Sequence, residues 1–184
     1  MRRIALLLTV LLVAPFLYAQ SSPYAVLEYY GDDRELTIYD EDSFEVNFFL
    51  GMDLSPGDRI VTRQTSVELR LEPNGSIMKI GPATAFTLEA IQGRDGALSN
   101  TVSVERGKLR TVAARLRGTE YEVRLPSAVA AVRGTDFVVQ VEEGTTQSLV
   151  VLDGEVAFSK PTTGESLQLG AGEGADAAGE SFEV

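Results

Sequence analysis

The acidic side chains are the residues of this sequence with the widest scope for chemistry. The 184 residues include 27 Asp and Glu, but neither histidine nor cysteine. Ser-His-Asp and Cys-His nucleophiles are therefore excluded, and so are the usual zinc sites. Paired carboxylates, as glycosidases use, remain available. None of them lies in a distinctive motif, and most fall on outward strand positions or in turns. We therefore predict no enzyme, no catalytic residue, no metal and no cofactor.

Two acidic turns and one group of aromatic residues are candidate ligand sites. The turns Asp32-Asp33 and Asp40-Glu41-Asp42 bring carboxylate oxygens together, which could bind Ca²⁺. Their spacing is not that of an EF-hand, and a solvated turn is the competing interpretation. A sugar-binding platform could be formed by aromatic side chains, for which packing in the core is the competing interpretation; these are Tyr24, Tyr29, Tyr30, Phe48 and Phe49.

The chain is acidic, with a formal net charge of −11 at pH 7. Because like charges repel, we expect neither a nucleic acid nor an anionic membrane surface as a partner. The charge fits a solubilising surface, or else a surface that binds cations or a basic partner.

The first 19 residues have the features of a secretory signal peptide. Met1-Arg2-Arg3 is positively charged, the run from Ile4 to Tyr18 is apolar, and the small residue Ala19 precedes polar residues. This run is shorter than the ~20 apolar residues of a membrane span. No cysteine follows it, which excludes a lipoprotein. We predict cleavage after Ala19 and export to the periplasm, the cell surface or the medium. An uncleaved membrane anchor is the alternative.

Short stretches of alternating apolar and polar residues run through the rest of the chain, with turn residues between them. In the stretch Val67–Leu71, for example, Glu68 and Arg70 are predicted to point outward. Almost no helical period is present; Lys108–Leu116 is the one candidate for a short helix, although Leu109–Ala113 also fits a strand. These patterns predict an all-β domain over residues 24–173, a single antiparallel sandwich of jelly-roll-like type. A flexible acidic tail is predicted over residues 174–184.

Turn chemistry yields two further local predictions. The strands Tyr24–Tyr30 and Glu35–Tyr39 are predicted to pair as a hairpin through Gly31-Asp32-Asp33. Arg106-Gly107 is predicted to be a turn between two strands.

The segment Arg133-Gly134-Thr135 separates two apolar runs and is therefore expected to be at least half buried. We expect Gly134 to occupy either a backbone conformation or a tight spot that a Cβ would disturb, and Arg133 to donate to a buried partner, a carboxylate or a carbonyl. Arg117-Gly118-Thr119 starts a similar stretch. Two copies do not establish a solenoid, which needs about three, so a short β-solenoid-like stack stays as the alternative fold.

The order of these motifs resembles that of the FecR domain family, over about Tyr24 to Glu173. In chain order the matching segments are Leu54…Gly57-Asp58…Ile60…Thr62, Val67-Glu68-Leu69, Asn74-Gly75-Ser76, Gly107-Lys108-Leu109, Val132-Arg133-Gly134-Thr135…Phe137, Leu152-Asp153-Gly154-Glu155-Val156 and Leu169-Gly170-Ala171-Gly172-Glu173. We interpret the family's motif residues as structural; they are Gly57, Asp58, Gly75, Gly107, Arg133, Gly134, Thr135, Phe137 and Gly154.

The resemblance implies an extracytoplasmic, all-β domain without enzymatic activity. The best-known members are transmembrane regulators, which pass a signal from a TonB-dependent outer-membrane transporter to a cytoplasmic sigma factor. This sequence has no sigma-binding segment ahead of the apolar run and no separate βαβ-type module after Gly179. Sigma-factor regulation is therefore not expected of it.

Two function hypotheses from different classes follow. The first is a binding module that senses or presents a protein partner in the cell envelope. The second is a structural or adhesive envelope protein that binds polysaccharide or assembles through exposed strand edges. The sequence leaves the oligomeric state and the identity of the partner open.

The signal-peptide interpretation can be tested directly. N-terminal sequencing of the exported protein is expected to begin near Gln20, since Ala19 ends the apolar run. A full-length species that stays in the inner membrane would favour the anchor instead.

Overall fold

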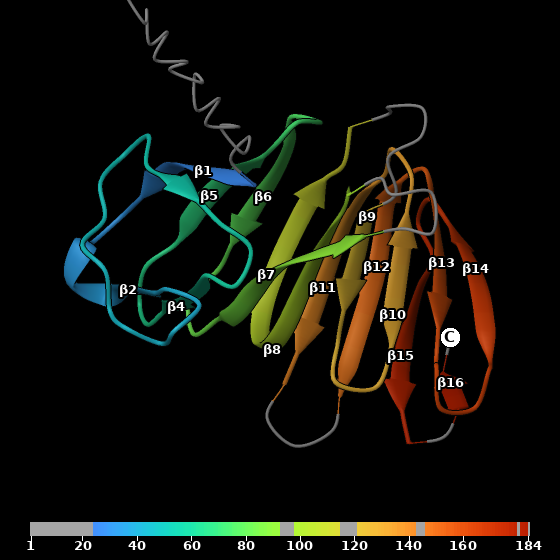
Figure 1. Ribbon diagram of the computed structural model, residues 1–184. Helices are drawn as coiled ribbons and strands as arrows, with labels where there is room; N and C mark the ends of the chain where they lie inside the picture. The colour runs from blue at the N-terminus through green and yellow to red at the C-terminus, as the bar shows by residue number, and fades with distance from the viewer. Residues whose placement is uncertain (1–23, 93–97, 115–120, 143–145, 180, 184) are drawn as a thin grey trace, which may run out of the picture.

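The computed structural model describes residues 24–92, 98–114, 121–142, 146–179 and 181–183. Most of them lie in sixteen β-strands, which hydrogen bonds join into one folded sheet (Figure 1). A 3-10 turn, Asp33–Glu35, lies between the first two strands. The strands are β1 (Ala25–Tyr30), β2 (Leu36–Tyr39), β3 (Asp53–Leu54), β4 (Arg59–Thr62), β5 (Val67–Leu71), β6 (Ser76–Ile80), β7 (Ala85–Gln92), β8 (Leu98–Val112), β9 (Tyr121–Arg124), β10 (Val129–Val132), β11 (Asp136–Val141), β12 (Gln147–Asp153), β13 (Glu155–Ser159), β14 (Ser166–Gly170), β15 (Gly174–Ala178) and β16 (Ser181–Glu183).

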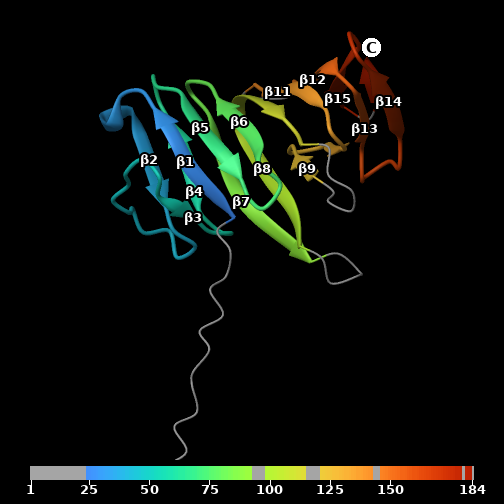
Figure 2. The same cartoon turned by 90° about the horizontal axis from the view of Figure 1, so that it is seen from above.

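The folded sheet forms two layers around one hydrophobic core, which confirms the predicted all-β sandwich (Figure 2). Layer A has the strand order β3, β1, β5, β6, β8, β11, β12, β15, β16. Layer B has the order β2, β4, β7, β8, β9, β10, β13, β14. The pairings are antiparallel except for β8 with β9, which is parallel, so the sheet is mixed.

Within each layer the strands follow one another in chain order, apart from β3, which lies outside β1. The colours of Figure 1 therefore run from blue at one end of the molecule to red at the other. Hairpins of consecutive strands occur in both layers: β5–β6 and β11–β12 lie in layer A, whereas β7–β8, β9–β10 and β13–β14 lie in layer B. The chain thus advances along one axis, as in the stack that was the alternative fold.

Strands β1 and β2 do not pair, so the predicted hairpin is wrong. Strand β1 lies in layer A between β3 and β5, whereas β2 lies in layer B beside β4. Leu27 of β1 and Ile38 of β2 are both fully buried. The turn at Gly31–Glu35 therefore carries the chain from one layer to the other, which lets both strands bury an apolar face.

The long strand β8 belongs to both layers. Its first part pairs with β7 and β9 in layer B, and from Gly107 onward it pairs with β11 in layer A. Arg106-Gly107 is therefore a point of change inside a strand rather than the predicted turn. The candidate helix is a strand: the alternative predicted for Leu109–Ala113 is confirmed up to Val112, where β8 ends, and Leu109 and Thr111 point into the core between exposed neighbours.

Only glycine fits at position 107, because of the backbone conformation there and because of the close approach of Thr84. Its φ is +97°, which L side chains rarely adopt, and a Cβ there would collide with both the backbone and the side chain of Thr84. Thr84 is fully buried, and its hydroxyl oxygen accepts a 3.0 Å hydrogen bond from the backbone N–H of Lys108.

Two buried tyrosines fasten the layers to each other. The Tyr24 hydroxyl, beside β1 of layer A, donates a 2.7 Å hydrogen bond to the carbonyl of Thr101 in the layer B part of β8. Tyr121 of β9 reaches the other way: its hydroxyl lies 3.3 Å from Thr111 Oγ1 and its ring packs on Phe137 of layer A. Burial raises the pKa of both phenols far above its usual value, so both stay neutral hydrogen-bonding groups.

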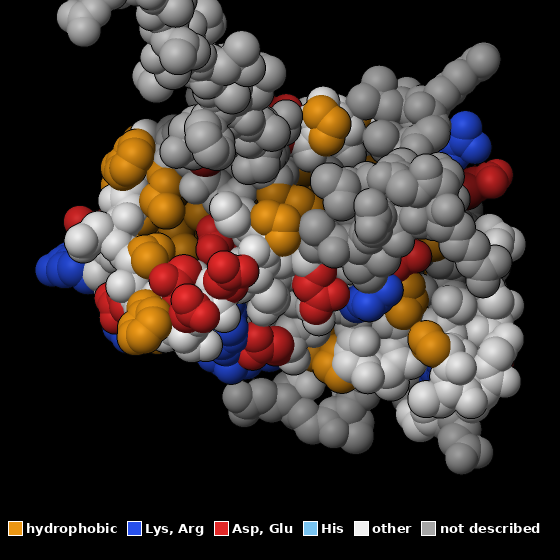
Figure 3. All heavy atoms as spheres, in the orientation of Figure 1, with side chains coloured by type: hydrophobic (Ala, Val, Ile, Leu, Met, Phe, Trp, Pro, Cys, Tyr) orange, Lys and Arg blue, Asp and Glu red, His pale blue; other side chains and the backbone are white. Residues whose placement is uncertain are grey.

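Residues 40–52, which we call the N-terminal strap, cover the first end of the sandwich. The Val46 N–H donates to the carbonyl of Ile38 in layer B, and the Gly51 N–H donates to the carbonyl of Leu27 in layer A. Phe48 packs edge-to-face on Tyr30, with 5.2 Å between ring centroids. Phe44 and Phe49 are exposed, and Figure 3 shows acidic and hydrophobic side chains side by side over this end.

The C-terminal residues form strands where a flexible tail was predicted. Strand β15 pairs with β12, and β16 pairs with β15, which extends layer A. Lys160, only 1% exposed, donates from its ammonium group to the carbonyls of Gly179 and Ser181, and it lies 5.0 Å from the ring centroid of Phe182. A buried cation therefore holds the last hairpin against layer B. No helix in the described ranges has the length and apolar character of a membrane span.

We expect Gly107→Ala to destabilise the fold by about 3 kcal/mol, because strain at positive φ adds to the collision with Thr84. Gly75→Ala is the matched control: its φ is +71°, but no atom lies within 4 Å of the added Cβ. The control is expected to cost about 1 kcal/mol, the strain alone. Urea unfolding of the two variants measures both values. Equal losses would contradict the close approach at Thr84.

We expect Lys160→Met to loosen the C-terminal hairpin first, because the carbonyls of Gly179 and Ser181 lose an ammonium donor while the apolar stem is kept. Hydrogen exchange of the β15 and β16 amides should accelerate at least tenfold, with little change in β5 and β6. The conservative Lys160→Arg variant, which keeps a cationic donor, serves as the comparison. Unchanged exchange in β16 would show that Lys160 does not hold the hairpin.

Candidate protein-interaction site

One row of side chains crosses the outer face of layer A from β1 to β12. Each member lies directly opposite the next in the strand register, so the row runs at right angles to the strands. From the N-terminal side, its members are Tyr29 (β1), Glu68 (β5), Lys79 (β6), Arg110 (β8), Val138 (β11) and Val150 (β12).

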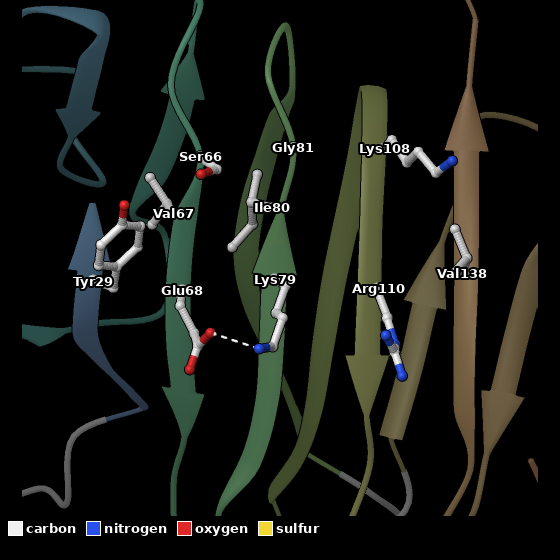
Figure 4. Close-up of a pocket in the computed structure, with 10 residues that line it drawn as sticks. All are labelled: Tyr29, Ser66, Val67, Glu68, Lys79, Ile80, Gly81, Lys108, Arg110 and Val138. Atoms are coloured by element: carbon white, nitrogen blue, oxygen red, sulfur yellow. Dashed lines mark ion pairs between the residues drawn. The ribbon is translucent and has the colours of Figure 1, made fainter. Parts of the chain in front are cut away.

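A groove of about 410 Å³ follows the first part of this row (Figure 4). Tyr29 stands on one side of it, and Lys108, Arg110 and Val138 stand on the other. Between them lies Gly81, the residue after β6, which has no side chain to fill the space. The twist of neighbouring strands and the missing side chain together leave the hollow.

The groove is locally cationic although the chain is acidic. Lys79 Nζ lies 3.0 Å from Glu68 Oε2, so this pair is neutral overall. The guanidinium of Arg110 donates two hydrogen bonds, of 2.9 and 2.6 Å, to the carboxylate of Asp136 and holds the pKa of that carboxyl below its usual value. Lys108 is exposed and forms no ion pair within the described part of the chain. It is the cation that an incoming ligand can use without breaking a pair.

The same face carries exposed apolar side chains. Tyr29 is 53% exposed, Val112 42%, Val150 43% and Leu152 46%. The other large exposed apolar residues among those described lie in the N-terminal strap. Such side chains, gathered on one face, are typical of a surface that binds another protein.

The outer face of layer B is different. Its long side chains are largely engaged in ion pairs, such as Arg59 with Glu105 at 2.6 Å and Arg124 with Glu122 at 3.4 Å. Among the residues whose side chains the structure describes, which leave out 90–92 and 98–100, no large exposed apolar side chain lies on it, and its exposed apolar residue is small, Ala131. Layer A therefore offers the better binding face.

Two of the family's motif residues, Gly57 and Asp58, build the turn before β4. Asp58 is 8% exposed, and its carboxylate accepts a 2.8 Å hydrogen bond from the Ser55 N–H. Desolvation raises the pKa of this carboxyl. Gly57 has φ +98°, and its N–H donates to the Leu88 carbonyl at 2.7 Å. This turn therefore ties β4 to β7 within layer B.

A second group of motif residues forms a joint between β11 and the β12–β13 turn. Thr135 is buried, and its hydroxyl donates a 2.8 Å hydrogen bond to the carbonyl of Glu155. A Cβ on Gly154, whose φ is +92°, would lie 2.9 Å from the same hydroxyl oxygen. Gly134 is buried with φ +65°, a backbone conformation that a Cβ would strain, as one of the two expectations for it required, and Phe137 is fully buried.

The expectation that Arg133 has a buried partner is wrong. Its side chain is exposed, and no ion pair holds it within the described residues. The apolar neighbours that suggested burial face inward, and Arg133 stands at the turn where the chain leaves β10, so its side chain can point to solvent. The remaining motif residues, Gly75 and Gly107, lie in a turn and inside β8.

The groove was not predicted from the sequence. Its lining residues come from β1, β5, β6, β8 and β11 and from the positions beside β5 and β6. None of the nine residues interpreted as structural lines it, although Val67, Glu68 and Lys108 belong to segments that match the family. The sequence held two indications of it: the outward position of Glu68, and the cations Lys79, Lys108 and Arg110, which lie at outward strand positions of an acidic chain. Only the strand order brings them together.

The other candidate sites are not assembled. Asp32 accepts hydrogen bonds from the Arg34 backbone and guanidinium, and Asp40 accepts from the N–H groups of Asp42 and Phe44, so these carboxylates stabilise their own turns. No group of three potential metal ligands occurs in the described residues. Of the aromatic set, Tyr24 is buried, Tyr30 packs with Phe48, and Tyr29 and Phe49 are exposed. Arg117-Gly118-Thr119 and residues 1–19 lie outside the described residues.

Two crystal structures share this fold. Both are of a protein from Parabacteroides distasonis ATCC 8503 that is provisionally assigned as an anti-sigma factor, at 1.65 and 2.50 Å resolution. Each has a TM-score of 0.55 and 21% sequence identity over 64% of this chain. The chain spans about half of their length, 53%. No curated protein matches the chain.

A family model described as FecR protein matches residues 58–157. The match begins at Asp58 of the first motif turn and ends just after the Gly154 joint, and it includes the whole of β8. It covers more than half of the 184 residues and agrees with the motif order found in the sequence. The chain therefore belongs to the FecR family.

Proposed function

We propose that this chain is a non-enzymatic protein-interaction module of the cell envelope, and that the outer face of layer A holds its protein partner. The observation that carries the proposal is the joint presence, on that layer, of the groove, the cationic side chains and the exposed apolar side chains. A protein partner can bury the apolar groups and neutralise Lys108 at the same time, and both changes favour association.

The chemistry of the groove suggests what the partner presents. Tyr29, Val138 and Val150 offer apolar contact, and Lys108 and Arg110 offer N–H donors. An extended segment with alternating apolar and acidic side chains would match this row. The net charge of −11 repels acidic molecules in general. A Debye length of about 8 Å limits that repulsion, so carboxylates close to the groove respond mainly to its own cations.

The carboxylates of the described residues support binding rather than catalysis. Glu68 and Asp136, on the same face as the groove, are in ion pairs with Lys79 and Arg110. Asp58, whose pKa is raised by desolvation, is engaged with the Ser55 N–H in a turn away from the groove. None of the three is held ready to exchange a proton with a ligand.

The proposed location rests on the N-terminal sequence. Met1–Ala19 has the charge, apolar run and small residue of a signal peptide, which supports a place outside the cytoplasm. The anti-sigma assignment of the two similar crystal structures belongs to those proteins. For this chain it supports the general proposal that the domain acts by contact with another protein.

Site-specific photo-crosslinking in cells tests the proposed face. A photoreactive residue placed at Val150, 43% exposed on layer A, is expected to form a discrete crosslinked product with a partner protein. The same residue at the exposed Ala131 of layer B is the control and is expected to give none. Crosslinks from Ala131 alone would place the partner on layer B and overturn the proposal.

A charge reversal then tests the groove. Lys108→Glu is expected to reduce the Val150 crosslink about tenfold, because it replaces the unpaired cation by a like charge for an acidic partner. Arg133→Glu makes the same change of charge at an exposed arginine outside the groove, and it should leave the product within about twofold of wild type. Thermal melts confirm that both variants are folded. Loss with Arg133→Glu but not with Lys108→Glu would move the site to the Arg-Gly-Thr turn.

A further inference from the structure

Strand β14 (Ser166–Gly170) is the outermost strand of layer B at the C-terminal end. It pairs with β13 alone, and Figures 1 and 2 both show it at the end of the sandwich. The Lys160 N–H donates to the Glu165 carbonyl at 2.8 Å, which sets the alternation of hydrogen bonds along the β13–β14 ladder. Leu167 and Leu169 accordingly bond to β13, whereas the backbone groups of Ser166, Gln168 and Gly170 point away from it.

The outward backbone groups of β14 are nearly all available. The Gly170 N–H is satisfied by the carboxylate of Glu173 at 2.7 Å. The N–H and carbonyl groups of Ser166 and Gln168, and the carbonyl of Gly170, have no partner strand within the described residues. Such a row of groups is a template for a further strand.

The other sheet edges of the described residues are protected, which makes β14 exceptional. Strand β2 is covered by the N-terminal strap, through the Tyr39–Glu45 bridge and the Val46 hydrogen bond to Ile38. Strand β3 has two residues and β16 has three, of which Glu183 is charged. Strand β14 has five residues and contains no charged residue and no proline, and no bulge interrupts its pairing with β13.

The sequence of β14, Ser-Leu-Gln-Leu-Gly, is nearly symmetric about Gln168. If two copies pair antiparallel about this residue, Gln168 meets Gln168 of the second copy, and Leu167 meets Leu169. Both leucines face the core side, since Leu169 is 3% exposed and Leu167 packs against the core. The small residues Ser166 and Gly170 meet at the ends. In this one register, the side chains of the two copies fit each other and their outward backbone groups lie opposite each other.

We propose that β14 pairs antiparallel with β14 of a second copy of this chain, about a twofold axis at Gln168. The two Gln168 residues exchange two N–H···O=C hydrogen bonds, and each Ser166 N–H donates to the Gly170 carbonyl of the other copy. Layer B then runs continuously through the dimer, and the outer face of layer A stays free in both copies. The dimer goes beyond the proposed function and would present two partner-binding faces, which raises avidity for a repeated partner.

Sedimentation of the chain between about 1 µM and about 1 mM tests this proposal, because so short a strand pair is a small interface and a weak dimer is expected. The wild-type mass should rise toward that of two chains. Gln168→Pro removes the exchanged N–H, Gln168→Lys places two ammonium groups at the axis, and each should weaken dimerisation at least tenfold. Thr162→Lys, the same charge in the exposed turn before β14, should not change it.

A disulfide trap locates the axis independently, because the chain contains no cysteine. Residues directly opposite each other in an antiparallel pair have Cα atoms about 5.5 Å apart, within the range of a disulfide. Gln168→Cys should therefore oxidise to a covalent dimer, and Thr162→Cys should stay monomeric under the same conditions. A monomer throughout the concentration range would overturn the proposal. So would a dimer that survives Gln168→Pro and is not trapped by Gln168→Cys.

Discussion

Strand β8 is hydrogen-bonded in both layers of the sandwich, and the place of the other elements depends on where it changes partners. The change occurs at Gly107, whose positive φ redirects the strand and whose missing Cβ lets it rest on Thr84. Before this point β8 holds β7 and β9, and after it β8 holds β6 and β11. One strand therefore sets the distance between the layers and the register of both.

The joint of a glycine and a buried threonine recurs along the chain. Gly107 rests on Thr84, Gly154 rests on Thr135, and a Cβ on Gly31 would lie 2.7 Å from the Thr65 hydroxyl oxygen. In each pair the threonine is buried and its hydroxyl hydrogen-bonds to backbone at a place where a strand begins, bends or ends. A short hydroxyl can satisfy backbone groups that the ladder leaves open, and glycine makes room for it. This arrangement gives three of the family's motif residues, Gly107, Thr135 and Gly154, a structural role.

In the same architecture, the residues that stabilise the fold differ from those that line the groove. The motif residues lie in turns and in the core, while the groove on layer A uses side chains that the fold leaves exposed. Because alternate residues of a strand face opposite ways, the outward row from Tyr29 to Val150 can vary without disturbing the inward residues. Side chains on this face can therefore change while the scaffold is kept. The two ends of the stack differ too, since the N-terminal strap covers one and β14 stays open at the other.

The sequence by itself determined the all-β class, the inward and outward faces of strands such as Val67–Leu71, the turns at Gly57, Gly75 and Gly154, and the family. These features depend on neighbours within a few residues, where alternation and glycine conformation act directly. Only the tertiary structure decided that β1 and β2 lie in different layers, that β8 continues through Arg106-Gly107, and that residues 174–183 extend layer A. It also decided that Arg133 faces solvent and that Tyr29, Lys79 and Arg110 share one row. The reason is physical: strand pairing joins backbone groups that are alike at every residue, so the choice of partner strand is made by the packing of the whole core and leaves little trace in any one segment.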